Sequence, residues 1–91
     1  MEAIYRSTNE KIFKAKYFGA TNTRGSRIKI VNIDTMEAKF IPYNYQYNNT
    51  RDNAINYIEQ ILTYNKVVKY FYDDDTKFWY LISKDTRDEQ L

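Results

Sequence analysis

The sequence contains no cysteine and no histidine, and it has only two glycines and one proline in 91 residues. The absence of cysteine excludes a disulfide framework, a thiol nucleophile and thiolate metal ligands. The absence of histidine removes the imidazole base and the usual zinc and iron ligand sets. The run Asp73–Asp75 lacks the EF-hand spacing and is expected to be a polar hairpin turn. Neither G-x-x-x-x-G-K-S/T nor G-x-G-x-x-G is present. We therefore predict a protein that is not an enzyme and that holds no metal or cofactor.

Aromatic residues, by contrast, are abundant: they make up 18% of the chain and include ten tyrosines. Together with 43% hydrophobic residues, they support a folded core and argue against disorder. The length suits one domain, which we expect to span residues 1–91, with frayed ends at 1–10 and 84–91. No stretch approaches the about 18 consecutive apolar residues of a membrane span, and the N-terminus lacks a signal peptide's apolar run. These features predict a soluble cytoplasmic protein with no membrane partner.

Charge is unevenly distributed along the chain, although the net charge is only +2. Residues 1–51 carry nine Lys/Arg and four Asp/Glu, a balance of +5, whereas residues 52–91 carry five and eight, a balance of −3. Lys14, Lys16 and Lys29 form a candidate basic patch within this basic half, and such a patch suits an anionic partner. The alternative is that these lysines only make the solvent-exposed face of a strand pair hydrophilic.

Hydrophobic periodicity predicts several strands and one helix. The helix has Asn49 or Thr50 as its N-cap, Asn65 as the residue that ends it, and a single apolar stripe. The stripe consists of Ala54, Ile55, Ile58, Ile61 and Leu62. Strands are expected at residues 11–18, 27–33, 38–42, 67–72 and 77–83. The predicted fold class is α+β: a two-layer, mostly antiparallel sheet in the order β-β-β-α-β-β, with one amphipathic helix packed on one face.

The loop between the first two predicted strands is the most distinctive segment. It combines two guanidinium groups with hydroxyls and an amide around Gly25, which suits recognition of phosphate or carboxylate. Its candidate binding residues are Thr21, Asn22, Thr23, Arg24, Ser26 and Arg27. A polar hairpin loop with solvated arginines is the alternative interpretation.

Aromatic residues near the helix and in the last hairpin form a further candidate site. Tyr43, Tyr45 and Tyr47 alternate along the chain, so their rings share one face of an extended segment, and Tyr72 and Trp79 belong to the last hairpin. Exposed rings beside lysines stack the bases of single-stranded nucleic acids, and tyrosine and tryptophan also anchor protein interfaces. We expect some tyrosines to line the core and several to lie on the sheet face that the helix leaves uncovered.

The segment Tyr17–Lys29, YFGATNTRGSRIK, resembles a motif of small proteins from phages, plasmids and bacterial genomes that reads Y-x-G-P-T-N-T-R-G-S-R-I-K-A. The strand that ends near Tyr43, the helix around Ala54 and the aromatic hairpin are similar in order, so the likeness covers most of the chain. The sequence departs from the pattern at Ala20, where the others often have proline, and in the Asn/Tyr-rich residues 44–49. The resemblance implies an accessory protein of a mobile element, such as one that disarms a host defence, with its site in the shared T-N-T-R-G-S-R run.

Three function hypotheses follow. The first is a non-catalytic phage or mobile-element protein that binds and inhibits a host nucleic-acid machine, as an anti-CRISPR-type inhibitor does. Its partner would be a host protein or ribonucleoprotein, with contacts to nucleic-acid backbone. The second is a single-stranded DNA- or RNA-binding protein in which basic strand and loop residues hold phosphates and exposed tyrosines stack bases. The third is a small nuclease or lyase that uses tyrosine, lysine and carboxylate groups. The identity of the partner and the oligomeric state stay open.

Overall fold

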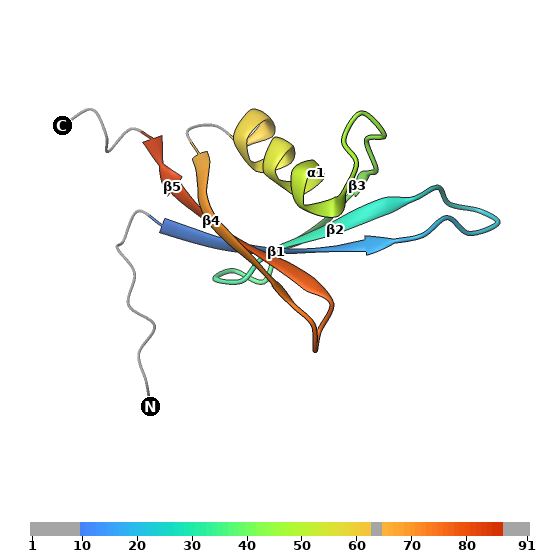
Figure 1. Cartoon of the computed structure of the whole chain (residues 1–91), viewed down its shortest axis with the longest axis horizontal. Helices are drawn as coiled ribbons and strands as arrows, with labels where there is room; N and C mark the ends of the chain where they lie inside the picture. The colour runs from blue at the N-terminus through green and yellow to red at the C-terminus, as the bar shows by residue number, and fades with distance from the viewer. Residues whose placement is uncertain (1–9, 63–64, 87–91) are drawn as a thin grey trace.

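The computed structural model describes residues 10–62 and 65–86. The described residues form β1 (Glu10–Phe18), β2 (Arg27–Asn32), β3 (Ala38–Pro42), α1 (Thr50–Asn56), the π-helical segment η1 (Tyr57–Ile61), β4 (Asn65–Asp73) and β5 (Phe78–Asp85). The strands make one antiparallel sheet in the order β3-β2-β1-β5-β4, and α1 lies on one side of it (Figure 1). The α+β class predicted from the sequence is therefore confirmed.

The first strand lies at the centre of the sheet, a position that hydrophobic alternation alone did not indicate. β1 pairs with β2 along residues 13–18 and with β5 along residues 10–15. After β3 the chain crosses one face of the sheet in the helical segment and returns as β4 on the opposite edge. The hairpins β1–β2 and β4–β5 are thus joined in the sheet along one half of β1. Every strand pair is antiparallel, whereas the sequence predicted a mostly antiparallel sheet.

The hydrophobic core lies between the helical segment and the three inner strands. Its buried members are Phe13 and Ala15 of β1, Ile28 and Ile30 of β2, Leu81 of β5, Ala54 of α1 and Ile58 of η1. Ala15 of β1 and Ala54 of α1 are both fully buried, and their small side chains allow the helix to pack close to the sheet. Partly buried residues, including Tyr43, Tyr57 and Trp79, pack around this cluster. One sheet face is therefore covered, and the other has no helix against it in the described part of the chain.

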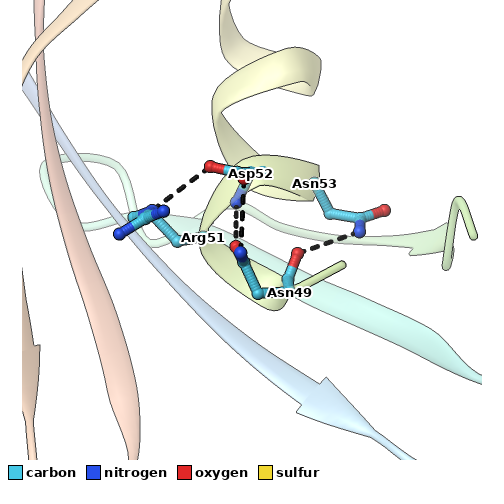
Figure 2. A network of polar contacts seen from close by, with 4 residues as sticks. All are labelled: Asn49, Arg51, Asp52 and Asn53. Carbon is cyan, nitrogen blue, oxygen red and sulfur yellow. Dashed lines mark hydrogen bonds and ion pairs between the residues drawn. The ribbon is translucent and has the colours of Figure 1, made fainter. Parts of the chain in front are cut away.

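The start of the helix agrees with the sequence prediction. Asn49 is the N-cap, and its side-chain oxygen accepts a 2.7 Å hydrogen bond from the backbone N–H of Asp52 (Figure 2). Asp52 itself lies in the first turn, where the helix dipole favours a negative charge. The cap satisfies one of the N–H groups that have no partner at a helix start.

The end of the helix differs from the prediction. Beyond α1 the chain widens into η1, where the N–H of Leu62 donates to the carbonyl of Tyr57 at 3.3 Å. A π-helical turn contains more residues than an α-helical turn, so it rotates the end of the apolar stripe away from the sheet. Ala54 and Ile58 are buried as predicted, but Ile61 is 62% exposed, so its assignment to the buried stripe is wrong. Within residues 10–62 and 65–86 no helix is long and apolar enough to cross a membrane.

The expected frayed ends need correction where the structure describes them. Glu10 begins β1 and pairs in register with Lys84 of β5, and Asp85 pairs with Asn65 of β4, so the sheet ladder holds these residues. Residues 1–9 and 87–91 of the same prediction lie outside the described residues. Asn65 begins β4 and does not end the helix, and its Oδ1 accepts a 3.2 Å hydrogen bond from the buried Ser83 hydroxyl.

Candidate functional site

The uncovered face of the sheet carries cations and aromatic rings side by side. Because core residues alternate along β1 and β2, the residues between them point to the opposite face. The strand register places Lys29 opposite both Lys16 and Phe40, and Phe18 opposite Arg27. We call this surface the basic–aromatic face; it consists of Lys14, Lys16, Phe18, Arg27, Lys29, Phe40 and Phe78. It brings together all three lysines of the predicted basic patch.

Each lysine of the basic–aromatic face lies against a phenylalanine ring. Lys14 Nζ is 4.8 Å from the centroid of the Phe78 ring, and Lys16 Nζ is 5.4 Å from the same centroid. Lys29 Nζ lies 5.9 Å from the centroid of Phe40. Cations within about 6 Å of a ring centroid are attracted by the negative face of the π system. These contacts offset part of the repulsion among the neighbouring lysines.

Arg27 begins β2, as the sequence predicted, and its side chain lies on the same face and not with the loop residues with which it was grouped as a binding set. Its guanidinium carbon lies 5.6 Å from the centroid of Phe18 and 5.4 Å from that of Phe40. The two rings contact each other edge to face at 5.6 Å. One guanidinium nitrogen donates to the Gly25 carbonyl at 3.4 Å, and the buried Nε has no hydrogen-bond partner among the described residues. Arg27 is therefore packed between two rings at the start of β2.

The predicted loop site is mostly occupied with its own hydrogen bonds. The N–H of Thr21 donates to the carbonyl of Arg24 at 2.7 Å, and the N–H of Arg24 donates to Thr21 Oγ1 at 3.0 Å. The hydroxyls of Ser26 and Tyr17 share a 2.9 Å hydrogen bond. Residues 21–25 are exposed and belong to the connection between β1 and β2, which extends beyond the sheet (Figure 1), whereas the basic–aromatic face is built on the strands themselves. The loop therefore closes the hairpin, and only Arg27 of the predicted set joins the lysines.

A second surface forms where the two hairpins diverge. The pairing of β1 with β5 ends at Ala15 and Trp79, and the rest of β1 continues beside β2 alone (Figure 1). An open hollow of about 690 Å³ lies at this fork. We call it the tyrosine hollow; it is lined by Lys16, Tyr17, Tyr43, Tyr45, Tyr47, Asn48, Asn49, Thr50, Tyr72, Lys77 and Trp79. All five aromatic residues singled out in the sequence line it, although they come from two distant segments.

The rings of the tyrosine hollow form two walls. On one side, Tyr43 contacts Tyr17 edge to face at 5.4 Å and Tyr45 in a tilted arrangement at 4.9 Å. On the other side, Tyr72 and Trp79 lie 5.2 Å apart. These rings lie on the helix side, whereas the sequence placed several tyrosines on the uncovered face. That expectation is wrong for them because the residue alternation in β1 and the β4–β5 register point them toward the layer that contains the helix.

The loop that carries Tyr43, Tyr45 and Tyr47 is fixed by asparagine side chains. Asn53 of α1 is 2% exposed, and its Oδ1 accepts a 2.7 Å hydrogen bond from the N–H of Asn44. Its Nδ2 donates to the carbonyls of Asn44 and Asn49 at 3.2 and 3.0 Å. Tyr47 donates its hydroxyl to Asn56 Oδ1 at 3.0 Å. The sequence showed only an asparagine-rich stretch here, and the buried partner on the helix was missed.

Arg51 links the start of the helix to the other wall. Its guanidinium carbon lies 5.0 Å from the ring centroid of Tyr70 and 5.6 Å from that of Trp79. Its Nε also donates to Asp52 Oδ1 at 3.2 Å, as Figure 2 shows. The helix start therefore holds the tyrosine loop through Asn53 and the last hairpin through Arg51. Sequence reasoning missed this role because the two partners of Arg51 lie far along the chain.

The acidic run at the tip of β4–β5 is a turn, as the sequence predicted. The N–H of Asp75 donates to Asp73 Oδ1 at 3.0 Å, and the Thr76 hydroxyl donates to Asp73 Oδ2 at 3.0 Å. Lys77 completes the turn with a left-handed φ of 64°. In the part of the chain that the structure describes, no group of three or more His, Cys, Asp and Glu side chains is arranged to hold a metal ion.

Comparison with known proteins adds no identification. No known protein family, curated protein or solved structure matches this chain. Inference about function therefore rests on the basic–aromatic face, the tyrosine hollow and the residues that position them.

Proposed function

We propose that this protein binds single-stranded nucleic acid on its basic–aromatic face. The observation that carries this proposal is the arrangement of Lys14, Lys16, Arg27 and Lys29 over three phenylalanine rings on the uncovered face of the sheet. Cations in such a surface neutralise phosphates, and rings at the same level stack bases. Both kinds of group lie within one contiguous surface of three adjacent strands and the start of β5.

The surface suits a single strand better than a duplex. Phe40 is 47% exposed and Phe71, farther along the same face, is 51% exposed, so ring surface is available for stacking. Phe71 already stacks on Tyr80 with their centroids 5.1 Å apart and their planes 9° from parallel. A base can stack on such a ring only when it is free of its own duplex neighbours. The proposal therefore specifies a strand whose bases are unpaired.

Salt-dependent binding of a labelled oligonucleotide tests the proposal. We expect affinity to fall with salt, with a slope of about −0.7 per neutralised phosphate for a single strand. Lys29→Ala should reduce the slope by about one such increment. Lys39→Ala is the matched control, because Lys39 pairs with the core residue Ile30 and so faces the other side of the sheet. Absence of binding at low salt, or equal affinity for a duplex of the same length, would overturn the proposal.

A second candidate function is inhibition of a host nucleic-acid machine without catalysis. This proposal draws on the resemblance to phage and plasmid proteins and on the exposed aromatic residues of edge strand β4, Tyr70, Phe71 and Tyr72, which are 46%, 51% and 43% exposed. Aromatic residues on an edge strand are suitable anchors for a protein partner. The test is target cleavage by a purified CRISPR ribonucleoprotein in the presence of the protein. Inhibition that Phe71→Ala abolishes and Lys39→Ala leaves intact would support it, and full cleavage at saturating protein would refute it.

A further inference from the structure

We infer that the tyrosine hollow binds one nucleotide, with its base between the two aromatic walls and its phosphate beside Lys77 at the rim. The identity of this ligand rests on the proposed function, whereas the evidence for a binding site is independent of it. The hollow is separate from the loop that the sequence favoured and lies on the opposite side of the sheet from the rings of the basic–aromatic face.

The geometry of the walls leaves space for a flat ligand. The Tyr17–Tyr43–Tyr45 wall and the Tyr72–Trp79 wall each have ring contacts within them. No ring contact joins the two walls among the residues that the structure describes. The hollow is open to solvent, and its volume of about 690 Å³ falls within the range of about 300–1,000 Å³ typical of small-ligand pockets. A planar group in the hollow would lie beside aromatic residues of both walls.

The charge of the lining selects the class of planar ligand. Lys16 and Lys77 line the hollow, and none of its described lining residues is an aspartate or glutamate. An aromatic cage for a cationic ligand would therefore have to overcome repulsion from Lys77, whereas an aromatic anion would be attracted. Asn48 and Thr50 add polar groups that can bond to the edge of a base. A nucleotide combines the flat ring, the polar edge and the negative charge.

Lys77 places its positive charge at the rim from a left-handed backbone position. Its φ is 64°, which glycine adopts at lower cost than any residue with a Cβ, so the turn carries strain that glycine would relieve. Met36 in the β2–β3 turn has the same conformation, with a φ of 62°, so the tight turns of this fold share this geometry. The Lys77 side chain supplies a positive charge at the edge of an aromatic hollow.

Lys16 connects the hollow with the basic–aromatic face. Its Nζ lies over Phe78 and Phe18 on that face, and the same residue lines the hollow at the fork of the sheet. A single strand bound along the basic–aromatic face can therefore reach the hollow at the fork without leaving positively charged surface. The nucleotide in the hollow would be the terminal one of the bound nucleic acid. A terminal nucleotide can pass from one side of the sheet to the other at the fork while the rest of the nucleic acid stays on the basic–aromatic face.

Trp79 is the only tryptophan in the chain, so its fluorescence reports directly on the hollow. The experiment titrates the full chain with uridine monophosphate (UMP) and, separately, with ribose phosphate, which lacks the base. We expect UMP to change Trp79 emission saturably and ribose phosphate to leave it unchanged. Emission that UMP does not alter, or that ribose phosphate alters equally, would overturn the inference.

Two variants test the roles of the wall and the rim. Tyr45 is 75% exposed, so Tyr45→Ala should leave the fold intact and weaken UMP binding about fivefold or more, the loss expected for one stacked base. Lys77→Gly should weaken UMP binding while keeping or raising the melting temperature, because it removes both the charge and the strain. Unchanged UMP affinity in both variants would overturn the assignment. Lys39→Ala is the matched control: Lys39 lies outside both the hollow and the basic–aromatic face, so its loss should leave UMP affinity unaltered.

The outcomes for this inference and for the proposed function are distinguishable. Loss of UMP binding with intact oligonucleotide affinity would overturn the role of the hollow alone. UMP binding without oligonucleotide affinity would overturn the proposed role of the basic–aromatic face and leave the hollow as a site for free nucleotides.

Discussion

The side-chain amide of Asn53 pairs with the backbone of Asn44 as a neighbouring strand would. Asn53 Oδ1 accepts from the N–H of Asn44 at 2.7 Å, and Asn53 Nδ2 donates to the carbonyl of Asn44 at 3.2 Å. The same Nδ2 donates to the carbonyl of Asn49, the N-cap of α1. One buried side chain therefore ties the tyrosine loop to the helix at both ends of the loop.

Replacement of Asn53 by alanine should destabilise the protein and loosen the tyrosine loop. The change removes three hydrogen bonds and leaves the backbone N–H of Asn44 without this partner, whereas the carbonyls of Asn44 and Asn49 keep their bonds from the backbone N–H groups of Tyr47 and Asn53. Because an unpaired polar group costs about 1–3 kcal/mol, we expect a loss of about 1–3 kcal/mol in the free energy of unfolding, measured by urea denaturation. The exposed Asn48 offers the control, and Asn48→Ala should change stability by less than about 0.5 kcal/mol. Equal losses for the two variants would show that Asn53 does not hold the loop.

The two arginines of the distinctive loop should separate in their effects on stability. Arg27 packs between the rings of Phe18 and Phe40, so Arg27→Ala removes two cation–π contacts and exposes both rings. We expect a loss of about 1–2 kcal/mol. Such a loss lowers the melting temperature by about 4–8 °C per kcal/mol in a chain of this size. Arg24 is exposed at the hairpin tip, and Arg24→Ala should leave the melting temperature nearly unchanged. Thermal unfolding followed by circular dichroism checks both, and an equal response would contradict the packed position of Arg27.

The three lysines of the basic–aromatic face show which parts of the site could be predicted from the sequence. Alternation predicted the strands and the common face of Lys14 and Lys16, because residues two apart on a strand point the same way, whereas Lys29 joins them through the β1–β2 register. The partners of these lysines could not be predicted, because Phe40 and Phe78 reach them only through the strand order of the sheet. Strand order depends on which hydrophobic faces pack together over the whole chain, which local patterns do not encode.

The π-helical segment provides a sharp test of packing at the end of the helix. Ile58 is fully buried and Ile61 is 62% exposed, although both belong to one apolar stripe by α-helical spacing. Ile58→Ala should cost about 2–5 kcal/mol in the free energy of unfolding, because it removes buried methyl groups and leaves a cavity. Ile61→Ala should cost less than about 0.5 kcal/mol, as expected for an exposed position. Chemical denaturation of both variants distinguishes the π turn from a regular helix, since a regular helix would make both substitutions costly.

The aromatic residues of the hollow were recognised in the sequence, but their grouping depended on polar contacts. Tyr43, Tyr45 and Tyr47 precede the helix, and Tyr72 and Trp79 follow it, so only the fold brings them together. The asparagines around the tyrosines suggested an irregular loop because asparagine favours turns. In the structure the same side chains order the loop through the buried amide of Asn53. Composition therefore indicated where a loop lies and could not indicate that it is held in one conformation.

Arg51 should stabilise the wall of the tyrosine hollow through ring contacts more than through its ion pair. Its guanidinium carbon lies 5.0 and 5.6 Å from the Tyr70 and Trp79 ring centroids, and its side chain is 32% exposed. Arg51→Ala should therefore lower the free energy of unfolding by about 1–2 kcal/mol, from two cation–π contacts of about 0.5–1 kcal/mol each, and should shift Trp79 emission to the red.

Asp52→Asn is the matched control for Arg51→Ala. It removes the ion pair at 3.2 Å and leaves both ring contacts of Arg51 in place. Because exposed ion pairs contribute about 0–1 kcal/mol, we expect a small loss of stability and no shift of Trp79 emission. If Asp52→Asn reproduced both effects of Arg51→Ala, the ion pair and not the rings would be the link between helix and hairpin. If only Arg51→Ala moves the emission, the stacked guanidinium holds Trp79 in the wall of the hollow.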